Sequence, residues 1–245
     1  MTKEEKAFEE ALDQNWKVVF SDTGTGNWQD SWVLDGEVGT VTNSPEGMIL
    51  AAGPEFRNDA HHMVLWTKDT FEGDVKIDYL YTRLDDEVRC VNILYIQATG
   101  SGAGEFDEDI MKWKELRSVP AMRMYFDHMN LYHISYAAYQ SEGEPQYIRA
   151  RRYMPEKDGL KGTGLEPDYY PEGLFEKGVP HKITVIKKDR DLLMRVENAD
   201  QVGYFHMTNP DLPVIEDGHI GLRHMFTRSA QYQDFSVSVL PESGS

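Results

Sequence analysis

Hydrophobic and polar residues alternate with a period of two along most of this chain, a pattern typical of half-buried β-strands. In the clearest segment, Val75, Ile77 and Tyr79 alternate with charged side chains. A shorter alternation of the same kind centres on Thr184. The pattern predicts strands at residues 16–20, 48–52, 63–67, 75–81, 91–98, 132–139, 147–153, 183–185, 192–198 and 220–225.

The segment from residue 3 to residue 14 fits a helical period instead. Thr2 and Glu5 have the spacing of a capping box, in which each side chain bonds to the backbone of the other residue. Phe8 and Ala11 then fall on one face of the predicted helix. We therefore expect one short N-terminal helix whose apolar stripe packs on the body of the protein.

The predicted strands follow one another without helices between them, and the chain contains no internal repeat. This order favours an all-β fold, an antiparallel two-sheet β-sandwich of the jelly-roll type, over a parallel α/β fold or a solenoid. Short segments rich in turn-forming residues separate the strands, namely Asp35-Gly36, residues 44–47, Glu142-Gly143, Lys188-Asp189 and Asp217-Gly218.

Two longer segments, residues 100–117 and 155–178, interrupt the strand pattern and are predicted to be loops. Loops of this length in a compact domain usually carry function, and we expect them at the rim of one sheet. The predicted organisation is an N-terminal helix at residues 1–15, a jelly-roll domain at residues 16–240 and a linker remnant at residues 241–245.

Charge narrows the classes of partner. The 245 residues include 25 Lys and Arg against 42 Asp and Glu, which gives a net charge of −17. Such a surface repels phosphate groups, so nucleic acids and anionic membranes are disfavoured as partners. The chain has no run of about 20 apolar residues, so we expect no membrane span.

Cys90 is the only cysteine, which excludes intrachain disulfides and cysteine-based zinc sites. The first residues lack the apolar stretch of a secretory signal. The location is therefore left open between the cytoplasm and, if a leader has been removed, the periplasm.

Residues 147–153 contain an unusual concentration of arginine for an acidic chain. In a strand, Ile148 and Ala150 face the core, while Arg149 and Arg151 lie on the other face with their Cα atoms roughly 6.5–7 Å apart. Paired guanidinium groups are suited to holding a carboxylate or sulfate group of a ligand. The alternative is an exposed strand face whose arginines pair with local acids.

His133 is the main candidate for proton transfer. It shares a predicted strand face with Ser135 and Tyr139, and a short hairpin at Gly143 would place it beside the arginine strand. Nearby guanidinium groups would lower its pKa and keep the imidazole neutral, able to act as a base. We expect Tyr153 to donate the proton to the leaving oxygen; alternatively, His133 only orients sugar hydroxyls.

On the strand at residues 220–225, Arg223 is expected to face a pocket, because His224 shares the opposite face with Ile220 and Leu222. His224 is kept as a third catalytic candidate. The remaining candidates for ligand binding are His62, Tyr95, Gln97 and Tyr139.

Metal and cofactor chemistry finds little support in the sequence. The histidines lack the spacings of zinc motifs, and the glycine-rich residues 100–104 are not followed by the Lys of a phosphate-binding loop. Two acidic runs, residues 85–87 and 107–109, could supply oxygen ligands to a structural Ca²⁺, although a solvated loop is the simpler interpretation. No cofactor is required by the predicted chemistry. We also find no pair of acids placed for glycoside hydrolysis.

Six blocks of the chain resemble a bacterial family long described as of unknown function. The resemblance implies a concanavalin-A-like jelly roll and an association with the breakdown of uronate-containing polysaccharides such as pectin and ulvan. The blocks lie at residues 61–66, 91–102, 120–123, 133–138, 149–153 and 220–225.

Together these features predict a carbon–oxygen lyase whose partner is a uronate-containing oligosaccharide. The arginines would neutralise the uronate carboxylate and so ease removal of the adjacent proton, after which the C4 substituent leaves by β-elimination. We expect a dehydratase that releases water from a non-reducing-end uronate, or else a lyase that cleaves a sugar linkage of a small oligosaccharide or polysaccharide. The alternatives are a lectin-like carbohydrate-binding module without catalysis and an atypical glycoside hydrolase. The sequence does not indicate the oligomeric state.

Overall fold

Antiparallel strands make up nearly all the regular structure of this computed structural model, which describes residues 1–241. The helical elements are α1 (Lys3–Leu12), α2 (Met122–Phe126) and three short 3₁₀ helices, η1 (Trp28–Asp30), η2 (Asp59–His61) and η3 (Ile110–Arg117). The strands are β1 (Lys17–Asp22), β2 (Trp32–Asp35), β3 (Thr40–Ser44), β4 (Gly47–Ala51), β5 (Met63–Thr70), β6 (Val75–Arg83), β7 (Cys90–Gly100), β8 (Met129–Tyr139), β9 (Tyr147–Tyr153), β10 (Gly164–Tyr169), β11 (Pro180–Lys188), β12 (Asp191–Glu197), β13 (Val202–Thr208), β14 (His219–His224) and β15 (Ser229–Val239).

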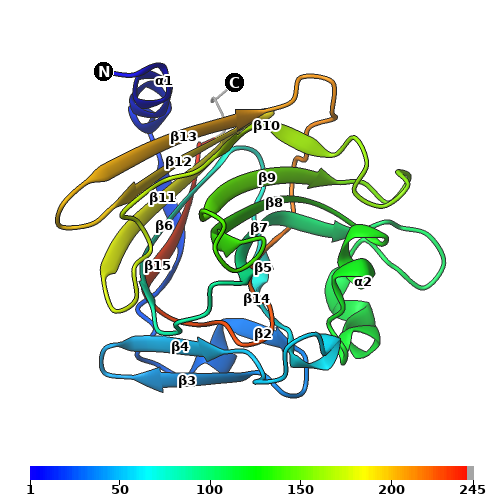
Figure 1. The fold of residues 1–245 in the computed structure, drawn as a ribbon. Coiled ribbons are helices and arrows are strands. Elements are labelled where there is room, and N and C mark those ends of the chain that lie inside the picture. The colour runs from blue at the N-terminus through cyan, green and yellow to red at the C-terminus, as the bar shows by residue number, and fades with distance from the viewer. Residues whose placement is uncertain (242–245) are drawn as a thin grey trace.

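The strands form two facing layers (Figure 1). One layer has the order β3-β4-β15-β6-β11-β12-β13, with β1 also paired to β15, and the other has the order β2-β5-β14-β7-β8-β9. Strand β10 pairs with β9 and with β13, so it joins the layers at one edge. The predicted antiparallel two-sheet sandwich with a short N-terminal helix is confirmed.

The main core lies between the layers. Leu94, Ile134 and Ala150 project into it from one sheet, and Ile77 and Val185 project from the other. A second apolar cluster covers the outer face of the β5-β14-β7-β8-β9 sheet, where η3 and α2 pack. One sheet is therefore buried on both faces, and its outer face carries the site described below.

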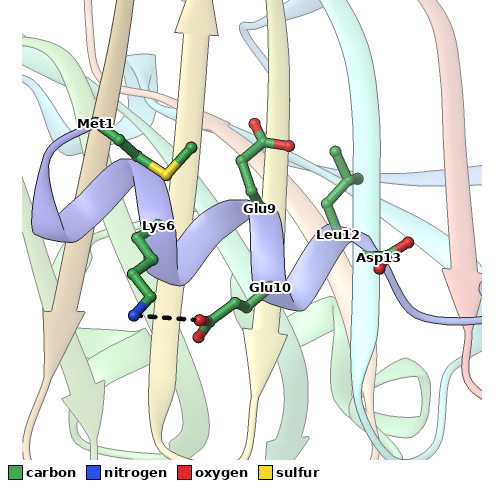
Figure 2. A pocket seen from close by; sticks show the side chains of 6 residues that line it. All are labelled: Met1, Lys6, Glu9, Glu10, Leu12 and Asp13. Atoms are coloured by element: carbon green, nitrogen blue, oxygen red, sulfur yellow. Dashed lines mark ion pairs between the residues drawn. The ribbon is translucent and has the colours of Figure 1, made fainter.

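Helix α1 begins as its sequence predicts. The backbone N–H of Glu5 donates to Thr2 Oγ1 and that of Thr2 donates to Glu5 Oε2, each over 3.1 Å, which completes the capping box. Phe8 packs against β11 and β12. The other face of α1 lines a shallow hollow and carries an ion pair between Lys6 and Glu10, at 3.8 Å (Figure 2).

Five strands lie outside the predicted set: β2, β3, β10, β13 and β15. Strand β10 falls inside the segment predicted as a loop at residues 155–178, and η3 occupies the end of the segment predicted as a loop at residues 100–117. These elements add strands to both layers without changing the architecture.

Within residues 1–241, no helix has the length and apolar character needed to cross a lipid bilayer. Over the same residues, no group of three or more His, Cys, Asp or Glu side chains is placed to hold a metal ion. The linker predicted at residues 241–245 lies, apart from its first residue, outside the described part of the chain.

Candidate functional site

One row of side chains crosses the outer face of the doubly covered sheet. The strand register places His133 of β8 opposite Tyr95 of β7 on one side and opposite Arg151 of β9 on the other. Ser135 lies opposite Arg149 in the next row. The predicted hairpin therefore does bring His133 beside the arginine strand. We call Tyr95, His133, Ser135, Arg149 and Arg151 the polar row.

His133 makes two short contacts through its ring. Its Nδ1 lies 2.7 Å from the Tyr153 hydroxyl, and its Nε2 lies 2.5 Å from Ser135 Oγ. Burial lowers the pKa of His133 well below its usual value of 6.5, and the charges of Arg151, Arg223 and Arg149 lower it further. The imidazole is therefore neutral near pH 7, as predicted, although burial contributes more than like charge.

Tyr153 is fully buried behind His133, whereas 4% of the surface of His133 and of Ser135 is exposed. Ser135 and His133 thus keep the small exposed area of this group. Burial also raises the pKa of the Tyr153 hydroxyl well above 10, so this group keeps its proton. In this arrangement Tyr153 acts on the imidazole rather than directly on a ligand.

The two arginines of β9 have different partners. Arg149 donates to Asp168 Oδ2 from Nε at 2.8 Å and from Nη2 at 2.6 Å, and it lies over the Tyr147 ring. Arg149 therefore pairs with a local acid, which was the alternative to ligand binding for this strand face. The side chain of Arg151 has no hydrogen bond or ion pair with residues 1–241, so its guanidinium is available to a ligand.

Arg223 reaches the same face from β14 and is fully buried. Its Nη2 donates to the Pro120 carbonyl and to His62 Nδ1, both over 2.6 Å. Burial and the charge of Arg223 lower the pKa of His62 to about 3. Arg223 does lie on the face opposite His224, as expected, but it is fully buried rather than facing a described pocket, and His62 lies against it as a neutral hydrogen-bond acceptor.

A stack of aromatic rings supports the row. Trp66 stacks on Tyr95 with ring centroids 5.5 Å apart, and Tyr125 of α2 stacks on both. Tyr95 meets His133 edge to face at 5.8 Å. The stack therefore packs against one side of the His133 ring and restricts its orientation.

Asp35 ties this stack to η3. Its Oδ2 accepts from Trp66 Nε1 at 2.7 Å, from Arg117 Nε at 2.6 Å and from the Tyr125 hydroxyl at 3.0 Å. Burial raises the pKa of Asp35 although Arg117 acts in the opposite direction. Sequence reasoning placed Asp35 in a turn and did not connect it with the site, since its partners are 31 to 90 residues away along the chain.

Two predicted ligand-binding residues lie elsewhere because of β-bulges. Ala137, at φ 46°, is an extra residue in β8, so Ala138 takes the outer face and Tyr139 is displaced from the face of His133. Gln97, at φ 54°, has the same effect in β7, and its Nε2 donates to the carbonyls of Phe71 and Gly73. A bulge reverses the alternation of the residues that follow it, so the expectations for Tyr139 and Gln97 were wrong.

His224, the third catalytic candidate, lies on the inner face of β14. Its Nε2 is 2.8 Å from the Tyr232 hydroxyl, and its Nδ1 is 3.3 Å from the Arg228 carbonyl oxygen. The side chain is fully buried between the layers. The structure therefore does not bring His224 together with His133, because successive residues of a strand point to opposite faces.

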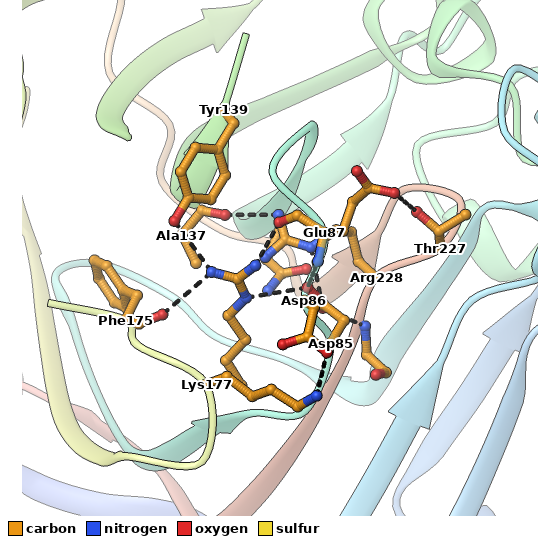
Figure 3. A network of polar contacts seen from close by, with 12 residues as sticks. Asp85, Asp86, Glu87, Ala137, Tyr139, Phe175, Lys177, Thr227 and Arg228 are labelled. Atoms are coloured by element: carbon orange, nitrogen blue, oxygen red, sulfur yellow. Dashed lines mark hydrogen bonds and ion pairs between the residues drawn. The ribbon is translucent and has the colours of Figure 1, made fainter. Parts of the chain in front are cut away.

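The acidic run at residues 85–87 belongs to a network of ion pairs (Figure 3). Asp85 accepts from Arg83 Nε at 3.0 Å and from Arg228 Nε at 3.1 Å. The Tyr139 hydroxyl accepts from Arg83 Nη1 at 3.1 Å in the same network. These contacts explain where Tyr139 goes, and they occupy the Asp85 carboxylate that the sequence offered to Ca²⁺.

One described family of proteins matches nearly the whole chain. A family model described as "Domain of unknown function (DUF1961)" matches residues 22–237. No curated protein matches the sequence.

Three solved structures illustrate the similarity of fold. A Bacillus subtilis protein of unknown function with a galectin-like fold has 16% identity and a TM-score of 0.67, over 92% of this chain and 100% of its own. The exoplasmic/lumenal domain of VIP36, bound to Ca²⁺ and Man3GlcNAc, has 12% identity and a TM-score of 0.58, over 95% and 93% of the two chains. Lectin II from Ulex europaeus has 8% identity and a TM-score of 0.58, over 90% and 98%. At these identities the similarity establishes the fold alone.

Proposed function

This chain belongs to the DUF1961 family, a domain of unknown function, and we propose that it binds an acidic saccharide at the polar row and cleaves it by β-elimination. The observation that carries the proposal is the neutral, buried imidazole of His133 beside the unpaired guanidinium of Arg151. A base and a carboxylate-binding group next to each other are the two requirements for removing a proton α to a carboxylate.

Arg151 would hold the uronate carboxylate. A guanidinium neutralises the charge and donates paired hydrogen bonds, so negative charge that develops beside the carboxylate costs less. Arg149 is less available to the ligand, because Asp168 accepts from its Nε and Nη2 and offsets its charge. The expected pair of carboxylate ligands is thus reduced to one direct ligand.

His133 would take the proton from C5 of the uronate. The electrons of the C5–H bond form a C4–C5 double bond, and the C4–oxygen bond breaks. The imidazolium then returns its proton to the departing oxygen, which leaves as water from a free hydroxyl or as an alcohol from a linked sugar. Tyr153 would hold His133 in position through the 2.7 Å contact at Nδ1.

A second candidate function is binding without reaction. The VIP36 domain is seen in complex with a saccharide and the Ulex europaeus protein is a lectin, and both share this fold over more than nine-tenths of their length. The same Arg151 could then hold the acidic sugar while His133 only orients its hydroxyls. We rank elimination first because a binding site does not need a buried neutral histidine.

The test is ultraviolet absorbance of an unsaturated uronate during incubation with a panel of uronate oligosaccharides, alongside calorimetric binding. Wild-type protein should generate the absorbance, and His133→Ala and Arg151→Gln should lose it. His206→Ala, which removes a histidine paired with Asp191 on the other sheet, is the matched control. Binding without absorbance would establish the binding module instead. If the whole panel gives neither absorbance nor binding, both functions are rejected.

A further inference from the structure

Arg223 is an anomaly in an acidic protein. Its side chain is fully buried, yet within residues 1–241 no carboxylate lies within ion-pair distance of it. Its Nε and Nη1 are buried without a hydrogen-bond partner, and its charge rests partly on the Tyr125 ring, 4.6 Å from Cζ. A buried cation without a counter-ion is costly, and proteins ordinarily pair such groups.

The acid that approaches this group is Asp59, whose Oδ1 lies 4.0 Å from His62 Nε2, and it forms no ion pair with Arg223. His62 is held neutral, and its Nε2 is also buried without a partner. The Tyr95 hydroxyl lies beside the same guanidinium: burial raises its pKa, whereas the charge of Arg223 and contacts with Tyr153 and Arg223 lower it. Unused donors of Arg223 in β14 and of His62, just after η2, therefore lie together near Pro120.

Arg223 and Arg151 lie on the same face, three strands apart in the order β14-β7-β8-β9. Strand spacing puts their backbones roughly 14 Å apart, and the side chains of Tyr95 and His133 lie between them. An oligosaccharide of several sugars that crosses this face can therefore present one acidic group to each arginine. We propose that Arg223 is a second anion subsite, and that the ligand of this protein is an oligosaccharide with two acidic groups.

The proposal rests on the proposed function for the role of Arg151 but not for the existence of the subsite. In the free protein, residues 120–122 cover Arg223 through the hydrogen bond to the Pro120 carbonyl. An entering carboxylate or sulfate group would take the free Nε and Nη1 donors and displace this cover. The buried charge would then gain its counter-ion only in the complex, which makes the preference for a second acidic group strong.

The test uses acetate as the probe, replacing chloride at constant ionic strength, and follows the melting temperature. At ten times its dissociation constant, acetate should raise the wild-type melting temperature by roughly 3–6 °C for each site that it occupies. Arg223→Met should lose one part of this shift, Arg151→Gln another, and the double variant all of it. Arg195→Met, which removes a half-buried arginine of the other sheet, should keep it in full.

The subsite would be overturned if acetate raised the melting temperature of Arg223→Met as much as that of the wild type. It would also be overturned if the wild type shifted no more than the double variant. If Arg151→Gln alone left the melting-temperature shift unchanged, this would count against the proposed function but not against the Arg223 subsite. If Arg223→Met does not fold, Arg223→Lys keeps the charge without the planar fork and should lose most of the Arg223 part. Once a substrate is found by absorbance, the Arg223 variant should prefer substrates with two acidic groups over substrates with one at least tenfold less than the wild type does.

Discussion

The neutral state of His133 is the residue property from which the proposed chemistry starts. A base is active when unprotonated, and the pKa of His133 is lowered well below 6.5 by burial and by three arginines. The rate of product formation should therefore stay constant as the pH is lowered from 8 through 6.5, and it should fall only in more acidic solution. A rate already halved at pH 6.5 or above would contradict the assignment of His133 as the base.

Tyr153 tests whether His133 must be held from behind. Tyr153→Phe keeps the ring but removes the hydroxyl at His133 Nδ1, a hydrogen bond worth roughly 1–3 kcal/mol when its partner is left buried. We expect kcat to fall about 10- to 100-fold with little change in KM, and the acid limb of the pH profile to move. Tyr204→Phe, on the sheet covered by α1, should change neither quantity. A change confined to KM would instead indicate contact between Tyr153 and the ligand.

At the scale of elements, Gly221 lets strand β14 pass beneath an aromatic ring. A Cβ atom at this position would lie 2.5 Å from Cζ3 of Trp66, whose indole lies flat beside Tyr95. Gly221→Ala must therefore move the ring stack that supports His133. We expect a loss of unfolding free energy of roughly 1–3 kcal/mol in urea denaturation, together with lower activity.

Gly164→Ala is the control for that substitution, because a Cβ there meets only the Glu166 carboxylate, at 3.4 Å. Equal stability of the Gly221 and Gly164 variants would show that the stack adapts at no cost.

The elements recovered from the sequence are those with unbroken alternation. Residues 147–153 are assigned without error because no bulge interrupts β9, and the short hairpin then fixes His133 opposite Arg151. The faces of Tyr139 and Gln97 could not be read in this way, since one extra residue with positive φ reverses the alternation and leaves no trace in residue type.

Other parts of the site depend on long-range pairing. Asp35 acquires its role from Trp66, Arg117 and Tyr125, which come from separate elements. Strand β15 could have been predicted, because residues 229–239 alternate apolar and polar side chains in part, but β10 has no such pattern. Its position is set by the two layers that it joins.

For the whole molecule, buried histidines set the response to acid. Burial lowers the pKa of His62 to about 3 and that of His224 to about 4, and it lowers those of His133, His181 and His219. The unfolded chain therefore binds more protons than the folded one below pH 6.5. Stability should be complete above pH 6.5 and decline as the pH falls toward 4.

Urea unfolding at pH 7.5 and at pH 5.5 measures this effect. Each histidine with a strongly lowered pKa should account for roughly 1.4 kcal/mol of the difference. Removing one of them, as in His224→Gln, should reduce the difference by about that amount. Identical unfolding free energies at the two pH values would show that these histidines titrate normally.

The pairing of distant strands also bears on how the protein is made. Strand β6 lies between β11 and β15, β1 pairs only with β15, and β5 pairs with β14. A chain leaving the ribosome therefore displays β1, β5 and β6 long before residues 219–239 are synthesised to complete their pairing. Until then, apolar strands with open edges are exposed to other nascent chains, so we expect the partly synthesised chain to aggregate more readily than the complete one.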